Sequence, residues 1–162
     1  MKELGDIGLG RPNLGQEMPV LVYRLFEMSM MDVLEKHYGK ERSDELIREA
    51  GFLSGKTFAA LNFTEKMEFN DFISALQDKL AEMKIGILRI ENANLEKGEI
   101  TLSVYEDLDC SGLPVSDEQI CVYDEGFISA ILEHYTGVKF NVREIDCWAS
   151  GERVCRFKAK SV

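Results

Sequence analysis

The chain contains 162 residues, of which 45% are hydrophobic and 30% are charged, as in an ordinary soluble globular protein. Its 29 acidic residues outnumber its 19 Lys and Arg residues, and the net charge of −10 argues against a nucleic-acid partner, since phosphate binding needs a basic surface. The sequence has no apolar run near the ~20 residues of a membrane span and no secretory signal at its N-terminus. We therefore expect a single cytoplasmic domain over residues 1–162 that neither binds nucleic acid nor crosses a membrane.

The first half of the chain predicts three helices behind a short arm. Residues 1–16 are rich in glycine and lack periodicity, which indicates an arm or loop. Apolar residues at helical spacing predict the first helix over residues 20–38, between a proline and a glycine. A second helix is expected over residues 43–61, with Ser43 as its N-cap, and a third over residues 70–80.

Two glycines, Gly51 and Gly55, lie one turn apart inside the second expected helix. Glycine is costly in a helix interior, so such a pair needs a compensating reason. We interpret it as permitting the close approach of another helix.

The second half of the chain changes from helical to alternating periodicity. Alternating residues predict four strands, at residues 85–91, 100–106, 138–147 and 153–159. A fourth helix is expected between the two strand pairs, over residues 117–135. The order is three helices, a hairpin, a helix and a hairpin. This segregation predicts an α+β fold in which an antiparallel sheet of two hairpins packs against about four helices.

Three of the four cysteines lie close to the C-terminus. Cys147 and Cys155 flank the last turn symmetrically, so a regular hairpin would place their Cβ atoms ~5 Å apart. Cys121 lies at the start of the fourth expected helix, where backbone N–H groups stabilise a thiolate. Zinc prefers thiolates and needs four donors, and Glu144 is a candidate for the fourth. In a regular strand Glu144 faces away from Cys147, so it joins the site only through a β-bulge or a marked twist.

The cysteine pattern alone leaves other interpretations open. Reduced cysteines are among the most buried side chains, so the group also suits an inert core, or a redox-active or disulfide pair. Cys110, in the loop before the fourth expected helix, is a candidate redox thiol or a half-buried loop residue. The sequence has no P-loop, dinucleotide fingerprint, nucleophile elbow or zinc-protease motif, so we expect that the chain is not an enzyme.

The segment EIDCWASGERVCRF, which begins at Glu144, together with Cys121, resembles the signature of the 4-vinyl reductase, or hydrocarbon-binding, domain family. The segments PVLVYRLFEMS, GFLSGKTFA and DCSGLPV are similar to that family as well. The resemblance implies an α+β fold related to ligand-binding domains of nitric-oxide signalling and of vesicle-tethering subunits. It also implies the zinc site of aromatic-responsive transcription activators, with three cysteines and one glutamate. In this chain those ligands are Cys121, Glu144, Cys147 and Cys155.

The resemblance implies a zinc-stabilised, non-enzymatic binding or sensor domain for a small hydrophobic or aromatic ligand. Four protein ligands leave no open position on the metal, so its role is structural. The implied pocket lies between the helices and the sheet. Its candidate lining residues are Phe72, Leu76, Leu80, Leu102 and Tyr105.

Phenol-responsive members of the family recognise the hydroxyl group with a histidine and a tryptophan. The corresponding stretches here, around Phe72 and Ile100, contain neither, so we expect a less polar ligand than phenol. The chain lacks the ATPase and DNA-binding modules of those regulators, so its signal is expected to pass through a homodimer or a signalling partner protein. Two alternatives remain, a cysteine-based redox sensor and a reductase of a vinyl-bearing tetrapyrrole.

Overall fold

The computed structural model describes residues 3–116 and 118–162. The chain divides into two compact units, Met1–Ser43 and Asp44–Val162. None of the helices in the described part of the chain has the length and apolar character that a membrane span requires.

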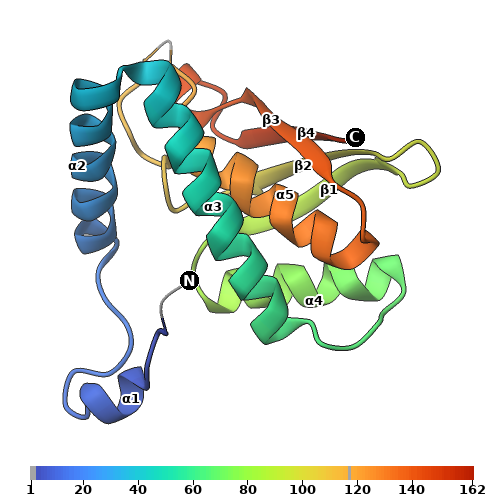
Figure 1. Ribbon diagram of the computed structural model, residues 1–162, viewed down its shortest axis with the longest axis horizontal. Helices are drawn as coiled ribbons and strands as arrows, with labels where there is room; N and C mark the ends of the chain where they lie inside the picture. Colours follow the sequence, from blue (N-terminus) through green and yellow to red (C-terminus); the bar gives the residue numbers. More distant parts are fainter. Residues whose placement is uncertain (1–2, 117) are drawn as a thin grey trace. The chain divides into compact units, whose positions relative to one another are not determined.

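The first unit contains α1 (Ile7–Gly10) and α2 (Val20–Tyr38), drawn in blue in Figure 1. α1 is a single turn within the segment that was expected to be an arm. α2 starts directly after Pro19 and ends at Gly39, whose φ of 78° is in the region that favours glycine. The predicted bounds of this helix are therefore confirmed.

The second unit is built on one antiparallel sheet of four strands in the spatial order β1-β2-β4-β3. The strands are β1 (Ile87–Asn94), β2 (Glu99–Tyr105), β3 (Phe140–Asp146) and β4 (Cys155–Ser161). The hairpins β1–β2 and β3–β4 meet where β2 pairs with β4, with Val104 opposite Cys155 at one end of that pairing. The predicted fold, an antiparallel sheet of two hairpins combined with helices, is confirmed.

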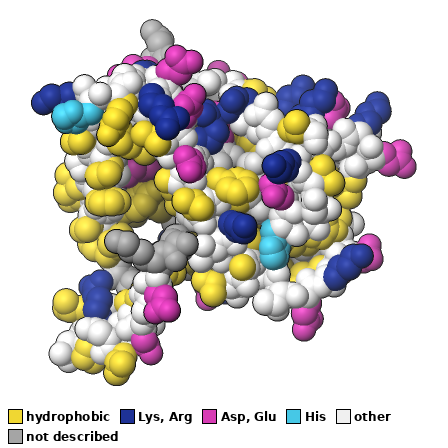
Figure 2. Space-filling view, viewed as in Figure 1, with side chains coloured by type: hydrophobic (Ala, Val, Ile, Leu, Met, Phe, Trp, Pro, Cys, Tyr) yellow, Lys and Arg dark blue, Asp and Glu magenta, His cyan; other side chains and the backbone are white. Residues whose placement is uncertain are grey.

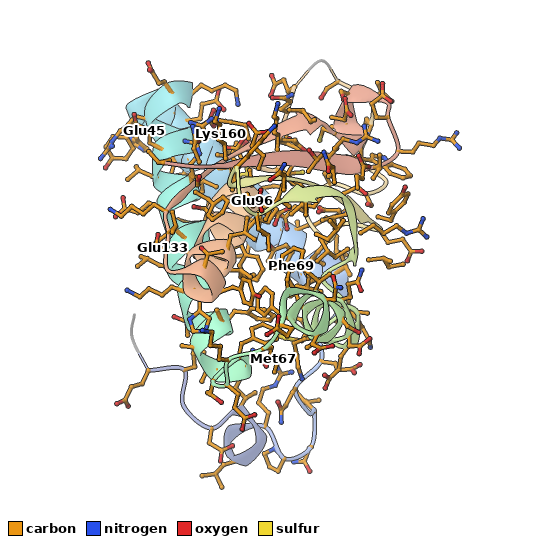
Figure 3. The ribbon with its side chains drawn as sticks, turned by 90° about the vertical axis from the view of Figure 1, so that its right-hand side faces the viewer. Glu45, Met67, Phe69, Glu96, Glu133 and Lys160 are labelled. Carbon is orange, nitrogen blue, oxygen red and sulfur yellow. The ribbon has the colours of Figure 1, made fainter. Side chains whose placement is uncertain are left out.

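Three helices accompany the sheet, α3 (Lys40–Asn62), α4 (Phe69–Glu82) and α5 (Val122–Thr136). Two views at right angles show α5 between the sheet and α3, and α4 at the β1 side of the sheet (Figures 1 and 3). The main hydrophobic core lies between the inner face of the sheet and these helices. Its most deeply buried members include Ala59, Phe72, Ile100, Phe157 and Ala159.

α3 and α5 cross in close contact at three glycines. A Cβ atom on Gly51 would collide with the carbonyl oxygen of Tyr123, and one on Gly126 would collide with that of Arg48. A Cβ atom on Gly55 would lie 2.9 Å from the Cα atom of Phe127, which is also too close. The prediction that Gly51 and Gly55 permit close helix packing is therefore confirmed, and Gly126 supplies the matching gap on α5.

Two predicted helix starts are wrong. α3 starts at Lys40, and the Ser43 N–H already donates to the Gly39 carbonyl at 3.0 Å, so Ser43 lies inside the helix. α5 starts at Val122, and the predicted start at residue 117 lies outside the described residues. The Ser116 N–H donates to the Ala149 carbonyl at 2.6 Å, which ties this segment to the last turn and keeps it out of the helix.

Candidate functional site

All four cysteines are completely buried and meet in one cluster, defined here as Cys110, Cys121, Cys147 and Cys155. Their Sγ atoms all lie within 4.8 Å of one another, and none forms a disulfide. The Sγ atom of Cys121 is 3.8 Å from that of Cys147 and 3.6 Å from that of Cys155. Sulfurs at ~2.3 Å from a tetrahedral zinc ion are ~3.8 Å apart, so the separations of Cys121 from Cys147 and from Cys155 fit such an ion.

Two of these cysteines are placed by helix starts and one by a strand. Cys121 is the N-cap of α5, and Cys155 is the first residue of β4. Cys147 is the N-cap of the 3₁₀ turn η1 (Trp148–Ser150), where the Ser150 hydroxyl donates to the Cys147 carbonyl at 2.8 Å and accepts from its N–H at 3.2 Å. The cluster therefore joins the start of α5 to both sides of the last turn.

Cys110 reaches the cluster from the loop between β2 and α5. The carboxylate of Asp107 accepts the N–H groups of Asp109 at 2.9 Å and Cys110 at 3.2 Å, which folds the loop into a tight turn. The Cys110 Sγ atom lies 2.9 Å from that of Cys155. Cys110 is thus completely buried rather than half-buried, and the sequence analysis did not include it among the metal ligands. Asp107 lies three residues before Cys110, and aspartate favours turns, so Asp107 is the sequence feature from which the turn at Cys110 could have been predicted.

Glu144 lies at the edge of the cysteine cluster. The β3–β4 register shifts between Glu144 and Asp146, which is the bulge that a contribution from Glu144 requires. Its Oε2 atom accepts the Cys121 N–H at 3.3 Å, and its buried Oε1 atom has no hydrogen-bond partner. Burial, together with the negative charge of Cys147, raises the pKa of Glu144 to about 8. The four thiols alone supply the four donors that a tetrahedral zinc ion uses, and Glu144 lies beside this group rather than in it.

Glu125 fixes the backbone at Glu144. Its Oε1 atom accepts the Glu144 N–H at 2.9 Å, and its Oε2 atom pairs with Arg48 and Arg143, each at 2.8 Å. Because Glu125 is only 6% exposed, this carboxylate links α3, α5 and β3 beside the site.

The thiols of the cysteine cluster shift one another's pKa values. Hydrogen bonds from Cys110, Cys121 and Cys155 lower the pKa of Cys147. The pKa of Cys121 is raised, first by its hydrogen bond with Cys110 and then by those with the other two thiols. Without a cation, one thiolate stabilised by neighbouring thiols is therefore favoured, whereas four thiolates need the charge of a metal ion.

An apolar cavity of about 40 Å³ lies between α4, α5 and the inner face of the sheet. Leu76, Leu80 and Leu102 line it, as the sequence analysis expected for its pocket residues. The other lining residues include Ile73, Leu88, Val104, Phe127, Ile131, Asp107 and Asp124.

Two of the expected lining residues lie elsewhere. Phe72 is buried but does not line the cavity, and it stacks on the ring of Tyr135, with the centroids 4.3 Å apart. Tyr105 lies on the outer face of β2, where the Arg89 guanidinium is 4.7 Å from its ring centroid. Leu102 and Tyr105 are three residues apart in one strand, so they face opposite sides of the sheet.

Two buried carboxyl groups at the cavity, Asp107 and Asp124, were not singled out from the sequence. Both line the cavity, and their carboxylate oxygens lie within 4.8 Å of each other and of the Cys121 Sγ atom. Burial raises the pKa of Asp107 and raises that of Asp124 well above its usual value. An aspartate in the first turn of a helix is already explained by the helix dipole, so the sequence does not distinguish Asp124.

Comparison with known proteins relates the chain to one family. Residues 100–161 match the family model of the 4-vinyl reductase domain. The uncharacterized protein MJ1642 of Methanocaldococcus jannaschii is 24% identical over 157 residues, which cover 92% of this chain and 81% of that protein.

Solved structures share the fold at low sequence identity. The phenol-responsive sensory domain of the transcription activator PoxR, with phenol, aligns with a TM-score of 0.70 and 19% identity over 91% of this chain and 78% of that chain. A vinyl-4-reductase family protein from Methanocaldococcus jannaschii aligns with a TM-score of 0.67 and 20% identity over 100% of this chain and 99% of that chain. The resemblance to the 4-vinyl reductase family is therefore confirmed, with residues 100–161 as the segment that matches the family's domain.

Proposed function

We propose that this chain is a non-enzymatic, zinc-stabilised domain that binds and senses a small hydrophobic or aromatic molecule. The observation that carries this proposal is the apolar cavity between α4, α5 and the sheet. Ligand sites are concave and mostly apolar, with a few polar groups that orient the ligand, and the cavity has this composition. The PoxR sensory domain, whose structure contains phenol, has a similar fold and supports an aromatic ligand.

Ligand binding requires the cavity to widen. Its volume of about 40 Å³ is well below the ~150 Å³ of an engineered protein cavity that binds benzene. Leu76 and Leu80 project into it from α4, opposite Leu102 on the sheet. We infer that α4 moves away from the sheet when a ligand enters, and that this displacement is the signal.

Thermal unfolding in the presence of toluene tests the proposal. Leu76→Phe fills the cavity, whereas Leu61→Phe makes the same change at a position in α3 that is 68% exposed. We expect toluene to raise the Tm of the unmodified chain and of the Leu61→Phe variant but not that of Leu76→Phe. If neither toluene nor another small apolar probe raises any Tm, the chain is not such a sensor.

We propose that the cysteine cluster binds one structural zinc ion. The expected ligands were Cys121, Glu144, Cys147 and Cys155, and the Sγ positions bring Cys110 to the same site. Because its sulfur lies among the other three, we favour Cys110 as the fourth ligand and place Glu144 at the edge. Zinc there would clamp the loop after β2 and the start of α5 to the last hairpin. Reduced thiols suit the cytoplasm, which we propose as the location.

A cysteine-based redox sensor is the second candidate function. It is favoured by the short separation of 2.9 Å between the Sγ atoms of Cys110 and Cys155. Oxidation by peroxide would join these two sulfurs and remove two thiolate ligands from the metal. Zinc that stays bound after mild peroxide treatment would contradict this function and leave the ligand sensor as the explanation.

We also propose that the chain acts as a homodimer through α2. None of the α2 side chains is buried, and Leu21, Leu25 and Phe26 are 64–67% exposed. Figure 2 shows apolar side chains gathered along this helix. α2 carries both acidic and basic residues, so an antiparallel second copy can pair charges while it covers the apolar side chains.

A further inference from the structure

The carboxyl group of Asp124 is buried in the wall of the cavity without a complete set of partners. The residue is only 9% exposed and lines the cavity, and its Oδ2 atom has no hydrogen-bond partner among the described residues. A buried carboxylate without a donor or a counter-charge is costly. The position of Asp124 in the first turn of α5 supplies part of the compensation through the helix dipole, but it supplies no donor to Oδ2.

Asp107 lies beside Asp124 and is held rigidly. Its Oδ1 atom accepts two backbone N–H groups of its own turn, and the residue is 4% exposed. No Lys or Arg among the described residues forms an ion pair with either carboxylate. The polar end of the cavity is therefore a pair of carboxyl groups that hydrogen-bond to each other, with Asp124 Oδ2 left over and no positive charge beside them.

We propose that the ligand of this cavity is a primary amine with an apolar body, whose ammonium group lies between Asp107 and Asp124. This inference rests on the proposed function of the cavity and specifies its ligand class. An ammonium group brings three donors and one positive charge, whereas a hydroxyl group brings one donor and no charge. The apolar body then lies among Leu76, Leu102 and Ile131, and Asp124 rather than a histidine or tryptophan selects the polar group.

Three probes with the same ring separate the contribution of the polar group from that of the apolar body. Benzylamine, benzyl alcohol and toluene are titrated calorimetrically into the full chain with its metal in place. We expect benzylamine to bind about tenfold more tightly than toluene or better, with benzyl alcohol in between. Equal or tighter binding of toluene or benzyl alcohol on the unmodified chain would overturn the amine assignment and leave the proposed sensor intact.

Asp124→Asn tests the residue that selects the amine. It replaces the acid, which can pair with an ammonium group, by a neutral amide of the same shape, so the preference for benzylamine over toluene should disappear while toluene affinity stays the same. Asp78→Asn, the same change at an exposed position in α4, should preserve the preference. A preference that survives in Asp124→Asn would refute the role of this carboxylate. If no probe binds the unmodified chain, both this inference and the proposed function are wrong, and that result does not depend on the folding of any variant.

Discussion

At the scale of single residues, the most consequential side chain is Cys155. Its Sγ atom lies 2.9 Å from that of Cys110 and 3.6 Å from that of Cys121. Cys155→Ser should abolish zinc binding and lower the free energy of unfolding by more than ~4 kcal/mol, because the energy of a structural zinc ion is folding energy. Metal analysis and denaturant unfolding measure both effects. An unchanged unfolding midpoint would show that the cysteine cluster does not hold a structural metal.

The fourth zinc ligand can be identified from the number of coordinating sulfurs. In the cobalt-substituted protein the sulfur-to-metal charge-transfer absorption grows with each thiolate ligand. If Cys110 is the fourth ligand, Cys110→Ser should remove about a quarter of this absorption, and Glu144→Gln should leave it unchanged. The opposite pattern would restore Glu144 to the ligand set.

The positions of three cysteines of the cluster can be predicted from the sequence, but the position of the fourth cannot. Cys121, Cys147 and Cys155 come together as their spacing predicts, because a helix start and a hairpin determine their positions. Cys110 could not be placed, since it belongs to a loop whose path depends on the turn at Asp107 rather than on any periodicity. Tyr105 could have been excluded, since strand alternation already puts it opposite Leu102.

At the scale of elements, the three-glycine crossing holds α3 and α5 in close contact. Gly126→Ala should lower the free energy of unfolding by about 1–3 kcal/mol or more, because the new methyl group meets the Arg48 carbonyl, which cannot move without its helix. Gly10→Ala is the control, since no atom lies within 4 Å of a Cβ at that position. Urea unfolding of both variants measures the difference. A Gly126→Ala variant as stable as the control would mean that the two helices are not tightly packed.

The elements themselves follow from periodicity, but their ends do not. Helical spacing and strand alternation predict the order of helices and hairpins because each element buries one face. The starts of α3 and α5 depend instead on backbone hydrogen bonds, such as the bond from the Ser116 N–H to the Ala149 carbonyl, which joins two loops. A contact between loops distant in sequence leaves no periodic signal.

At the scale of the whole molecule, α2 connects the chain to a second copy in the proposed dimer. Leu25→Glu places a charge in its apolar surface and should shift the chain from dimer to monomer. Leu61→Glu makes the same change at an exposed position in α3 and should leave the assembly unaffected. Sedimentation velocity at several concentrations measures the state of each variant. A monomeric unmodified chain at all concentrations would remove the homodimer from the proposed function.

The antiparallel pair formed by Val104 and Cys155 has a thermodynamic consequence. Val104 in β2 lines the apolar cavity, and Cys155, opposite it in β4, belongs to the cysteine cluster. A ligand in the cavity and a zinc ion in the cluster would therefore both constrain the pairing of β2 with β4. Cooperativity between two sites is reciprocal: the factor by which zinc strengthens ligand binding must equal the factor by which ligand strengthens zinc binding. We expect chelation to weaken toluene binding, and saturating toluene to raise the chelator concentration that removes half of the zinc at equilibrium. A domain with this linkage binds its ligand more tightly when zinc is available than when it is not.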